Sequence, residues 1–110
     1  MVQELSSDRS RPLKEVDVDL LVFVERYVTN LLKWDLVTLF AQNPEAGYTL
    51  ARLAQSLGRS GHVVRPELGD LIWLGVLERS AASAEPTYRL TTDPALRGLA
   101  LKFAKYMATP

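Results

Sequence analysis

The sequence predicts a mainly α-helical chain with one small β-hairpin near its C-terminal end. Apolar residues recur at helical spacing along most of the chain. Two short segments with the alternation of β-strands follow the fourth helical stretch, and glycine, proline or a capping residue marks most boundaries. The expected order is therefore helix, helix, helix, helix, hairpin, helix. A length of 110 residues is enough for one domain with a modest core.

The expected domain begins after a polar N-terminal segment. Residues 1–14 show no hydrophobic period, so we expect a flexible arm there. No linker interrupts the rest, which is expected to form a single domain over residues 15–110. Its expected parts are a first helix over 15–30, a central core over 31–92 and a last helix over 93–108.

The first helix carries a broad apolar face that does not continue into the second helix. Its apolar positions include Leu20, Val24 and Tyr27. If this helix continued unbroken, Asp35 and Thr38 would fall on the apolar face. We therefore expect a second helix to begin near Asn30, a residue type that caps helices well.

Capping and turn residues place the remaining elements. Thr49 is expected to begin a short third helix that ends at Gly58, because glycine adopts the left-handed conformation found after many helices. Gly75 is expected to end the fourth helix in the same way. An Asp-Pro pair at residues 93–94 starts the last helix. The strands of the hairpin are expected over residues 76–80 and 87–91.

Composition argues against several kinds of chemistry. The chain has no cysteine and one histidine, and it lacks a glycine-rich phosphate loop, so we expect no metal and no cofactor. Glu15, Asp17 and Asp19 lie where a first helix begins, and the helix macrodipole explains them without catalysis. The apolar run at residues 20–24 is too short to cross a membrane. We expect a soluble, cytoplasmic protein that is not an enzyme and has no membrane partner.

Charge is balanced in total but uneven along the chain. The 13 basic and 13 acidic residues give a net charge of zero, which argues mildly against a nucleic-acid binder. Residues 48–66, however, contain Arg52, Arg59 and Arg65 and no acidic residue. An acid-free stretch of this length also arises by chance at this charge density, so charge alone does not define the function.

Three motifs in order resemble the winged helix-turn-helix domains of bacterial transcription regulators, most nearly the arsenic-repressor and multiple-antibiotic-resistance-repressor families. The sequence TLARLAQSLGRS at 49–60 resembles the first helix of their helix-turn-helix pair. The leucines and glycine of 68–79 resemble the junction between recognition helix and wing, and YRLT at 88–91 resembles the returning wing strand. The resemblance covers about residues 31–107 and is more specific for the fold than for the function.

The resemblance implies a transcription regulator that binds double-stranded DNA. The fourth helix would enter the major groove, and the wing would contact flanking phosphates. For each arginine involved, the alternative is an ordinary solvated charge, and for His62 it is an incidental exposed residue. The implied DNA contacts are Arg52, Arg59, Ser60, His62, Arg65, Arg79 and Arg89.

The same families act as dimers, and the first helix has a wider apolar face than one core contact needs. We therefore expect a homodimer formed by the first and last helices. Its expected anchors are Leu20, Val24, Tyr27, Leu101 and Phe103. No polar constellation in the sequence marks a site for a small-molecule effector, so the effector is unknown.

Pro66 departs from the pattern of these families. Proline lacks the N–H that bonds four residues back, and in a helix interior it costs about 3 kcal/mol. We therefore expect the regular fourth helix to begin at or near Pro66. Glu67 and Asp70 would then lie on its exposed face, where they repel phosphate. This departure supports an alternative function, a winged-helix module for protein–protein interaction without specific DNA binding.

Overall fold

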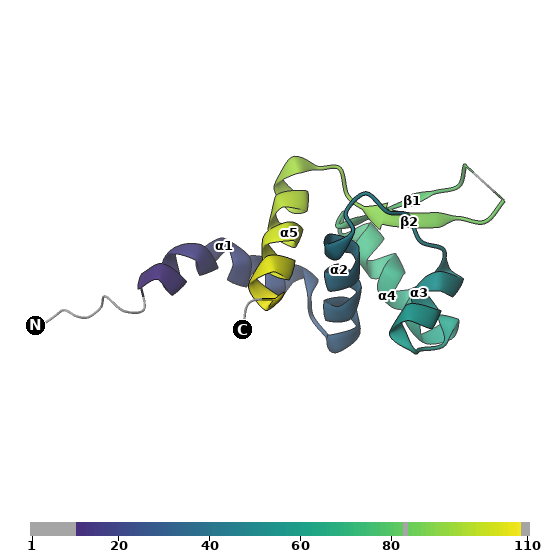
Figure 1. Cartoon of the computed structure of the whole chain (residues 1–110), viewed down its shortest axis with the longest axis horizontal. Helices are drawn as coiled ribbons and strands as arrows, with labels where there is room; N and C mark the ends of the chain where they lie inside the picture. The colour runs from purple at the N-terminus through teal and green to yellow at the C-terminus, as the bar shows by residue number, and fades with distance from the viewer. Residues whose placement is uncertain (1–10, 83, 109–110) are drawn as a thin grey trace, which may run out of the picture.

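The computed structural model of the chain describes residues 11–82 and 84–108. The first four helices are α1 (Arg11–Tyr27), α2 (Leu31–Gln42), α3 (Leu50–Leu57) and α4 (Gly61–Trp73). They are followed by strands β1 (Leu77–Ser80) and β2 (Thr87–Leu90) and by helix α5 (Pro94–Ala108). The two strands form an antiparallel hairpin (Figure 1). This order confirms the predicted fold class, five helices with one hairpin between the fourth and the fifth.

Helix α1 begins earlier than the sequence pattern predicts. The expected arm covered residues 1–14, of which 1–10 lie outside the described residues, whereas residues 11–14 are helical. Pro12 stands in the first turn of α1, where a backbone N–H has no partner inside the helix and its loss costs little. The helix ends at Tyr27, three residues before the predicted limit.

The predicted capping residues begin and end helices where expected. Asn30 precedes α2, and its side-chain oxygen accepts a hydrogen bond from the backbone N–H of Lys33 at 2.8 Å. Thr49 caps α3 in the same way, accepting from the N–H of Arg52 at 3.2 Å. Two glycines adopt positive φ after α3 and α4, namely Gly58 (φ 66°) and Gly75 (φ 87°). These boundaries follow from short-range chemistry alone.

The hydrophobic core lies between α2, α4 and α5, and α1 covers one side of it. Leu36, Val37 and Phe40 of α2 are fully buried. Phe103 of α5 stands at the centre of an aromatic cluster, with its ring 5.9 Å from Phe23 and 5.0 Å from Trp34. This cluster attaches α1 and α5 to the body of the molecule, as the crossing of α1 and α5 in Figure 1 shows. Among the described residues, no helix has the length and apolar character needed to cross a membrane.

The predicted start of the fourth helix at Pro66 is wrong, because α4 begins at Gly61 and contains Pro66. The N–H groups of Val63 and Val64 bond to the carbonyl of Ser60 at 3.1 and 3.2 Å. Pro66 deprives only the carbonyl of His62 of a partner, and both residues are exposed, so water can satisfy that carbonyl. The longer helix buries Val64 completely. Burial of a valine side chain contributes about 2 kcal/mol, which offsets most of the roughly 3 kcal/mol that the proline costs.

The hairpin is attached to the body at its base. Leu77 and Leu90 are paired across the strands and buried. Tyr48, just before α3, forms an isolated bridge with Tyr88, and their backbone hydrogen bonds measure 2.9 and 2.7 Å. The segment before α3 thus extends the small sheet and holds the hairpin in a defined position beside the α3–α4 pair.

Candidate nucleic-acid interface

Helices α3 and α4 pack against each other through their apolar sides. Leu53 of α3 is buried. A Cβ on Gly61 would lie 3.5 Å from the Leu50 side chain, so the start of α4 comes close to α3. Leu74 is 38% exposed because α4 ends at the preceding residue. The core side of α4 consists of Val64, Leu68 and Leu71, and the opposite side of the helix faces solvent.

A lysine from α2 binds both acidic side chains of α4. The ammonium group of Lys33 donates to Glu67 at 2.7 Å and to Asp70 at 3.1 Å. The side-chain amide of Asn30 donates to the same Glu67 oxygen at 3.1 Å. Lys33 is buried, with a side-chain exposure of 8%. Its hydrogen bond to Glu67 raises the pKa of Lys33, and the same bond, followed by that from Asn30, lowers the pKa of Glu67.

These ion pairs correct the expectation that Glu67 and Asp70 repel phosphate from the outer face of α4. Both carboxylates turn toward α2, although the Asp70 side chain remains 63% exposed. The lysine neutralises one of the two negative charges at a distance at which Coulomb attraction is strong even near a protein surface. Among the described residues, the side of α4 that faces away from α2 therefore carries no unpaired acid.

The arginines predicted to bind DNA are exposed on the α3–α4 pair. Arg52 lies on α3, Arg59 in the turn and Arg65 on α4. Within residues 11–82 and 84–108 none of the three forms an ion pair. Ser60 is the N-cap residue of α4, and its hydroxyl makes no capping hydrogen bond, while His62 is exposed in the first turn. The predicted contacts from 59–65 thus gather around the start of α4.

The two wing arginines lie on opposite faces of the hairpin. Arg89 is paired with Glu78 across the strands, whereas Arg79 is paired with Tyr88. A backbone hydrogen bond from Thr92 at 2.8 Å is the main cause that lowers the pKa of Glu78, so this carboxylate stays ionised beside Arg89. The sequence could not show this difference, because it depends on the register of the strands.

Two of the five predicted dimer anchors are buried within the chain itself, so they cannot be the main contacts with a partner. Leu20 and Phe103 have exposures of 4% and 0%, so they offer almost no surface to a partner. They are buried because α1 packs on α5 of the same chain. Val24, Tyr27 and Leu101 are half-buried against the core. In the part of α1 whose side chains are described, residues 18–27, the exposed apolar side chains are instead Val18, Leu21 and Val22.

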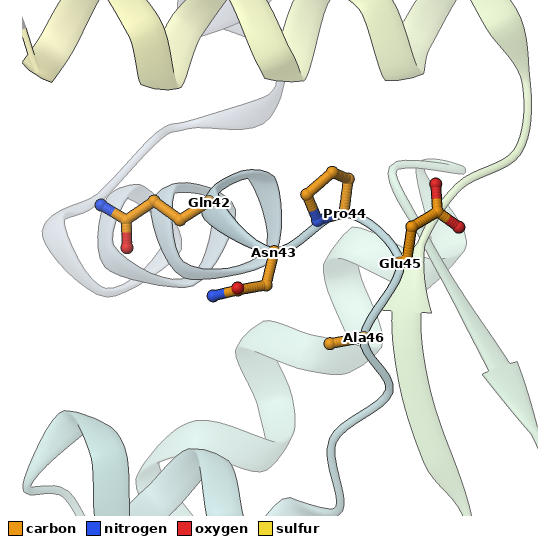
Figure 2. A pocket seen from close by; sticks show the side chains of 5 residues that line it. All are labelled: Gln42, Asn43, Pro44, Glu45 and Ala46. Atoms are coloured by element: carbon orange, nitrogen blue, oxygen red, sulfur yellow. The ribbon is translucent and has the colours of Figure 1, made fainter.

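A shallow hollow lies on the loop that follows α2, lined by residues 42–46. Figure 2 shows that the five side chains point in different directions and do not converge on one centre. Glu45 is paired with Arg97 of α5, which attaches the loop to that helix. In the described part of the chain, no three His, Cys, Asp or Glu side chains come together as a metal site.

Sequence reasoning missed three residues that shape the interface. Lys33 gave no indication of its role, because its partners are 34 and 37 residues away. Gly69 and Trp73 lie on the outer side of α4, where they continue the helical spacing of His62 and Pro66. Their spacing could have been seen in the sequence once the helix was extended back to residue 61.

A helix-turn-helix pair followed by a two-stranded wing, with a helix at each end, defines the winged helix-turn-helix architecture. No protein-family model and no curated protein matches the sequence. Among solved structures, the homodimeric DNA-binding domain Mb0332 of Mycobacterium bovis, a possible ArsR-family regulator, is 20% identical over 94% of this chain and 89% of its own, with a TM-score of 0.61.

Two further solved structures have the same fold. The transcriptional repressor BigR of Xylella fastidiosa is 17% identical, covers 91% of this chain and 98% of its own, and has a TM-score of 0.64. MepR of S. aureus, solved in complex with DNA, is 17% identical over 88% of this chain and 77% of its own, with a TM-score of 0.60. The chain therefore has a winged helix-turn-helix fold, the fold of these regulators.

Proposed function

We propose that the chain is a transcription regulator that binds double-stranded DNA as a homodimer through α4 and the wing. The observation that carries this proposal is the pairing of Lys33 with Glu67 and Asp70. In the described part of the chain it leaves Arg52, Arg59 and Arg65 as the unpaired charges of the α3–α4 surface, so this end of the molecule is positive despite a net charge of zero. The similarity to regulators, one of them solved with DNA, supports the same proposal.

The proposal requires a pair of subunits, because one short helix makes few contacts and winged helices bind two half-sites. The apolar side of α1 that faces away from α5 supplies a candidate contact. Val18 and Leu21 are each 64% exposed there, and Val22 is 47% exposed. Since α1 already buries its other side against α5, this second apolar side suits a partner subunit.

The salt dependence of binding tests the DNA proposal. A dimer that uses three arginines per subunit, namely Arg59, Arg65 and Arg79 of the wing, neutralises about six phosphates, so log K against log salt should have a slope of about −5. Replacing Arg59 and Arg65 together by alanine should flatten the slope by about 4, since each change acts twice. Fluorescence anisotropy of a labelled duplex at several salt concentrations measures this.

The matched control is Lys102→Ala, which removes an exposed charge from α5, a helix that packs mainly on α1 and α2. It should leave the slope unchanged. Absence of binding by the unaltered chain at low salt would end the DNA proposal.

A second candidate is a winged-helix module that binds another protein. It is favoured by Trp73, which is 88% exposed at the end of α4. An exposed aromatic residue of this size is a common anchor in protein interfaces. The same anisotropy titration separates the two candidates. Salt-dependent binding to the duplex supports the DNA proposal, whereas a protein-binding module need not bind the duplex at all.

A further inference from the structure

The surface of α4 that faces away from the core is a single line of four exposed residues. Successive members are four, three and four positions apart, which places them one above another along an α-helix. We call this the outer line of α4: His62, Pro66, Gly69 and Trp73. The buried residues of the same helix lie on its other side. The outer line is therefore the part of α4 that is accessible to a molecule bound on the side opposite the core.

Two members of the outer line weaken the helix that carries them. Glycine inside a helix is less stable than alanine, and a Cβ added to Gly69 would meet no atom within 4 Å. Pro66 removes a hydrogen bond from the second turn. Nothing inside the described part of the chain requires either residue, since both are exposed. A glycine and a proline side by side on a surface allow another molecule to approach the helix backbone closely.

The chemistry of the outer line differs from that of most base-reading helices. Purines are usually read by arginine, asparagine or glutamine through pairs of hydrogen bonds. Helix α4 contains no asparagine or glutamine, and its one arginine, Arg65, lies beside the line. Two of the exposed residues in its first half are apolar: Pro66, and Val63 with an exposure of 44%. Apolar side chains in the major groove contact the C5 methyl group of thymine.

We propose that α4 reads thymine through its methyl group, with Val63 and Pro66 as the contacting side chains and Gly69 allowing the helix backbone to approach the bases. This rests on the proposed DNA-binding function and names the bases that it selects. The arginines around the outer line favour a polyanion over an apolar protein groove as its occupant. The pairing of Lys33 with the two acids neutralises one of their two charges and so reduces the repulsion of a polyanion.

The test uses two duplexes of about 24 base pairs, long enough for two half-sites about 10 base pairs apart. One contains only A·T pairs, and the other has uracil in place of every thymine, which removes the methyl groups and leaves the phosphates and the pairing unchanged. We expect uracil to weaken binding about fourfold for each thymine methyl group that the helix touches. The slope of log K against log salt should not change. Methylation of cytosine at C5 in a G·C duplex should strengthen binding.

Replacing Gly69 by alanine gives a second readout. The helix gains stability, so Tm should rise by about 4 °C, while the added methyl group holds α4 away from the bases and weakens A·T binding at least fourfold. The matched control is Gly98→Ala on α5, where a Cβ also meets nothing within 4 Å. It should raise Tm by a similar amount without changing the affinity.

The possible failures are distinguishable. Equal, salt-dependent affinity for the thymine and uracil duplexes overturns the inference, leaves the proposed function intact and makes the outer line a candidate surface for a protein partner. Unchanged affinity of Gly69→Ala overturns it as well. A chain that binds no duplex at low salt overturns both the inference and the proposed function.

Discussion

At the scale of single residues, Lys33 determines the charge that α4 presents. Its ammonium group is buried between α2 and α4 and binds two carboxylates. Without it, Glu67 and Asp70 would be two unpaired negative charges beside Arg65. A buried ion pair contributes little to stability compared with an apolar replacement of both partners, but removal of one partner is costly. The value of Lys33 therefore lies in the position and charge of α4 as much as in stability.

Replacement of Lys33 by methionine should lower the free energy of unfolding at pH 7 by about 1–3 kcal/mol, because charged hydrogen bonds are removed from partly buried groups. The pKa of Glu67 in the folded chain lies below its ordinary value of 4.5. Its contribution to stability is therefore complete above about pH 4.5 and is lost as the pH falls through the lower folded-state pKa. The pKa of Lys33 in the folded chain lies above its ordinary value of 10.5. The stability that this group contributes is therefore complete below about pH 10.5 and is lost as the pH rises through the higher folded-state pKa.

Urea unfolding of the unaltered chain and of Lys33→Met between pH 3 and pH 7 measures this effect. The unaltered chain should lose more stability on acidification than the variant, whereas Glu78 contributes to the decrease in both. Lys102→Met serves as the control for the removal of a lysine. Identical pH profiles for the two chains would contradict a role of Lys33 in holding Glu67.

At the scale of elements, packing decides where α4 begins and which register the hairpin adopts. Helix α4 runs through Pro66 because the turn before the proline carries Val64 into the core. In the hairpin, the pairing of Leu77 with Leu90 sets the register. The register in turn places Arg79 and Arg89 on opposite faces, since side chains alternate along a strand.

The two wing arginines should therefore differ in their effect on DNA binding. Arg89 shares its face with the ionised Glu78, which offsets its attraction for phosphate, whereas Arg79 has Tyr88 as its neighbour. We expect Arg79→Ala to flatten the slope of log K against log salt by about 2 in a dimer, and Arg89→Ala by less than about 1. Anisotropy titrations of the two variants provide a matched comparison. Equal effects would show that strand register does not decide which arginine meets the phosphates.

At the scale of the whole molecule, the two ends have different surfaces. One end carries the α3–α4 pair and the hairpin, and the other carries α1 (Figure 1). Arg52, Arg59 and Arg65 lie at the first end, and the exposed apolar residues of α1 lie at the second. This separation lets a second copy cover α1 while the two ends that we propose to bind DNA remain accessible.

Replacement of Leu21 by glutamate should convert the proposed dimer into a monomer, because it places a charge in the middle of the apolar side of α1. Leu21 is 64% exposed in the single chain, so the change leaves the core untouched. Light scattering at tens of micromolar measures the mass. Gln42→Glu, an equally charged change at an exposed site on α2, should leave the mass unchanged. A monomeric mass for the unaltered chain would refute the dimer.

The sequence by itself determined the features that depend on neighbours within a few residues. Asn30 and Thr49 cap helices, and Gly58 and Gly75 end them, because each acts on backbone groups one to four positions away. The order of the elements, and with it the fold class, followed from these boundaries and from the apolar periods. The motifs also predict which elements carry Arg52, Arg59 and Arg65, namely α3, the turn and α4, whereas their contact with DNA stays a prediction.

Only the tertiary structure decided where α4 begins, where its acids point and which apolar residues remain exposed. The local cost of Pro66 predicts a late start, but the burial of Val64 against distant parts of the chain offsets most of that cost. Glu67 turns toward a lysine 34 residues away, and no short-range pattern contains that contact. Leu20 and Phe103 are buried where α1 packs on α5, whereas Leu21 is exposed. The sequence could not show this difference, because an apolar period indicates that one side of a helix is buried without indicating which element buries it.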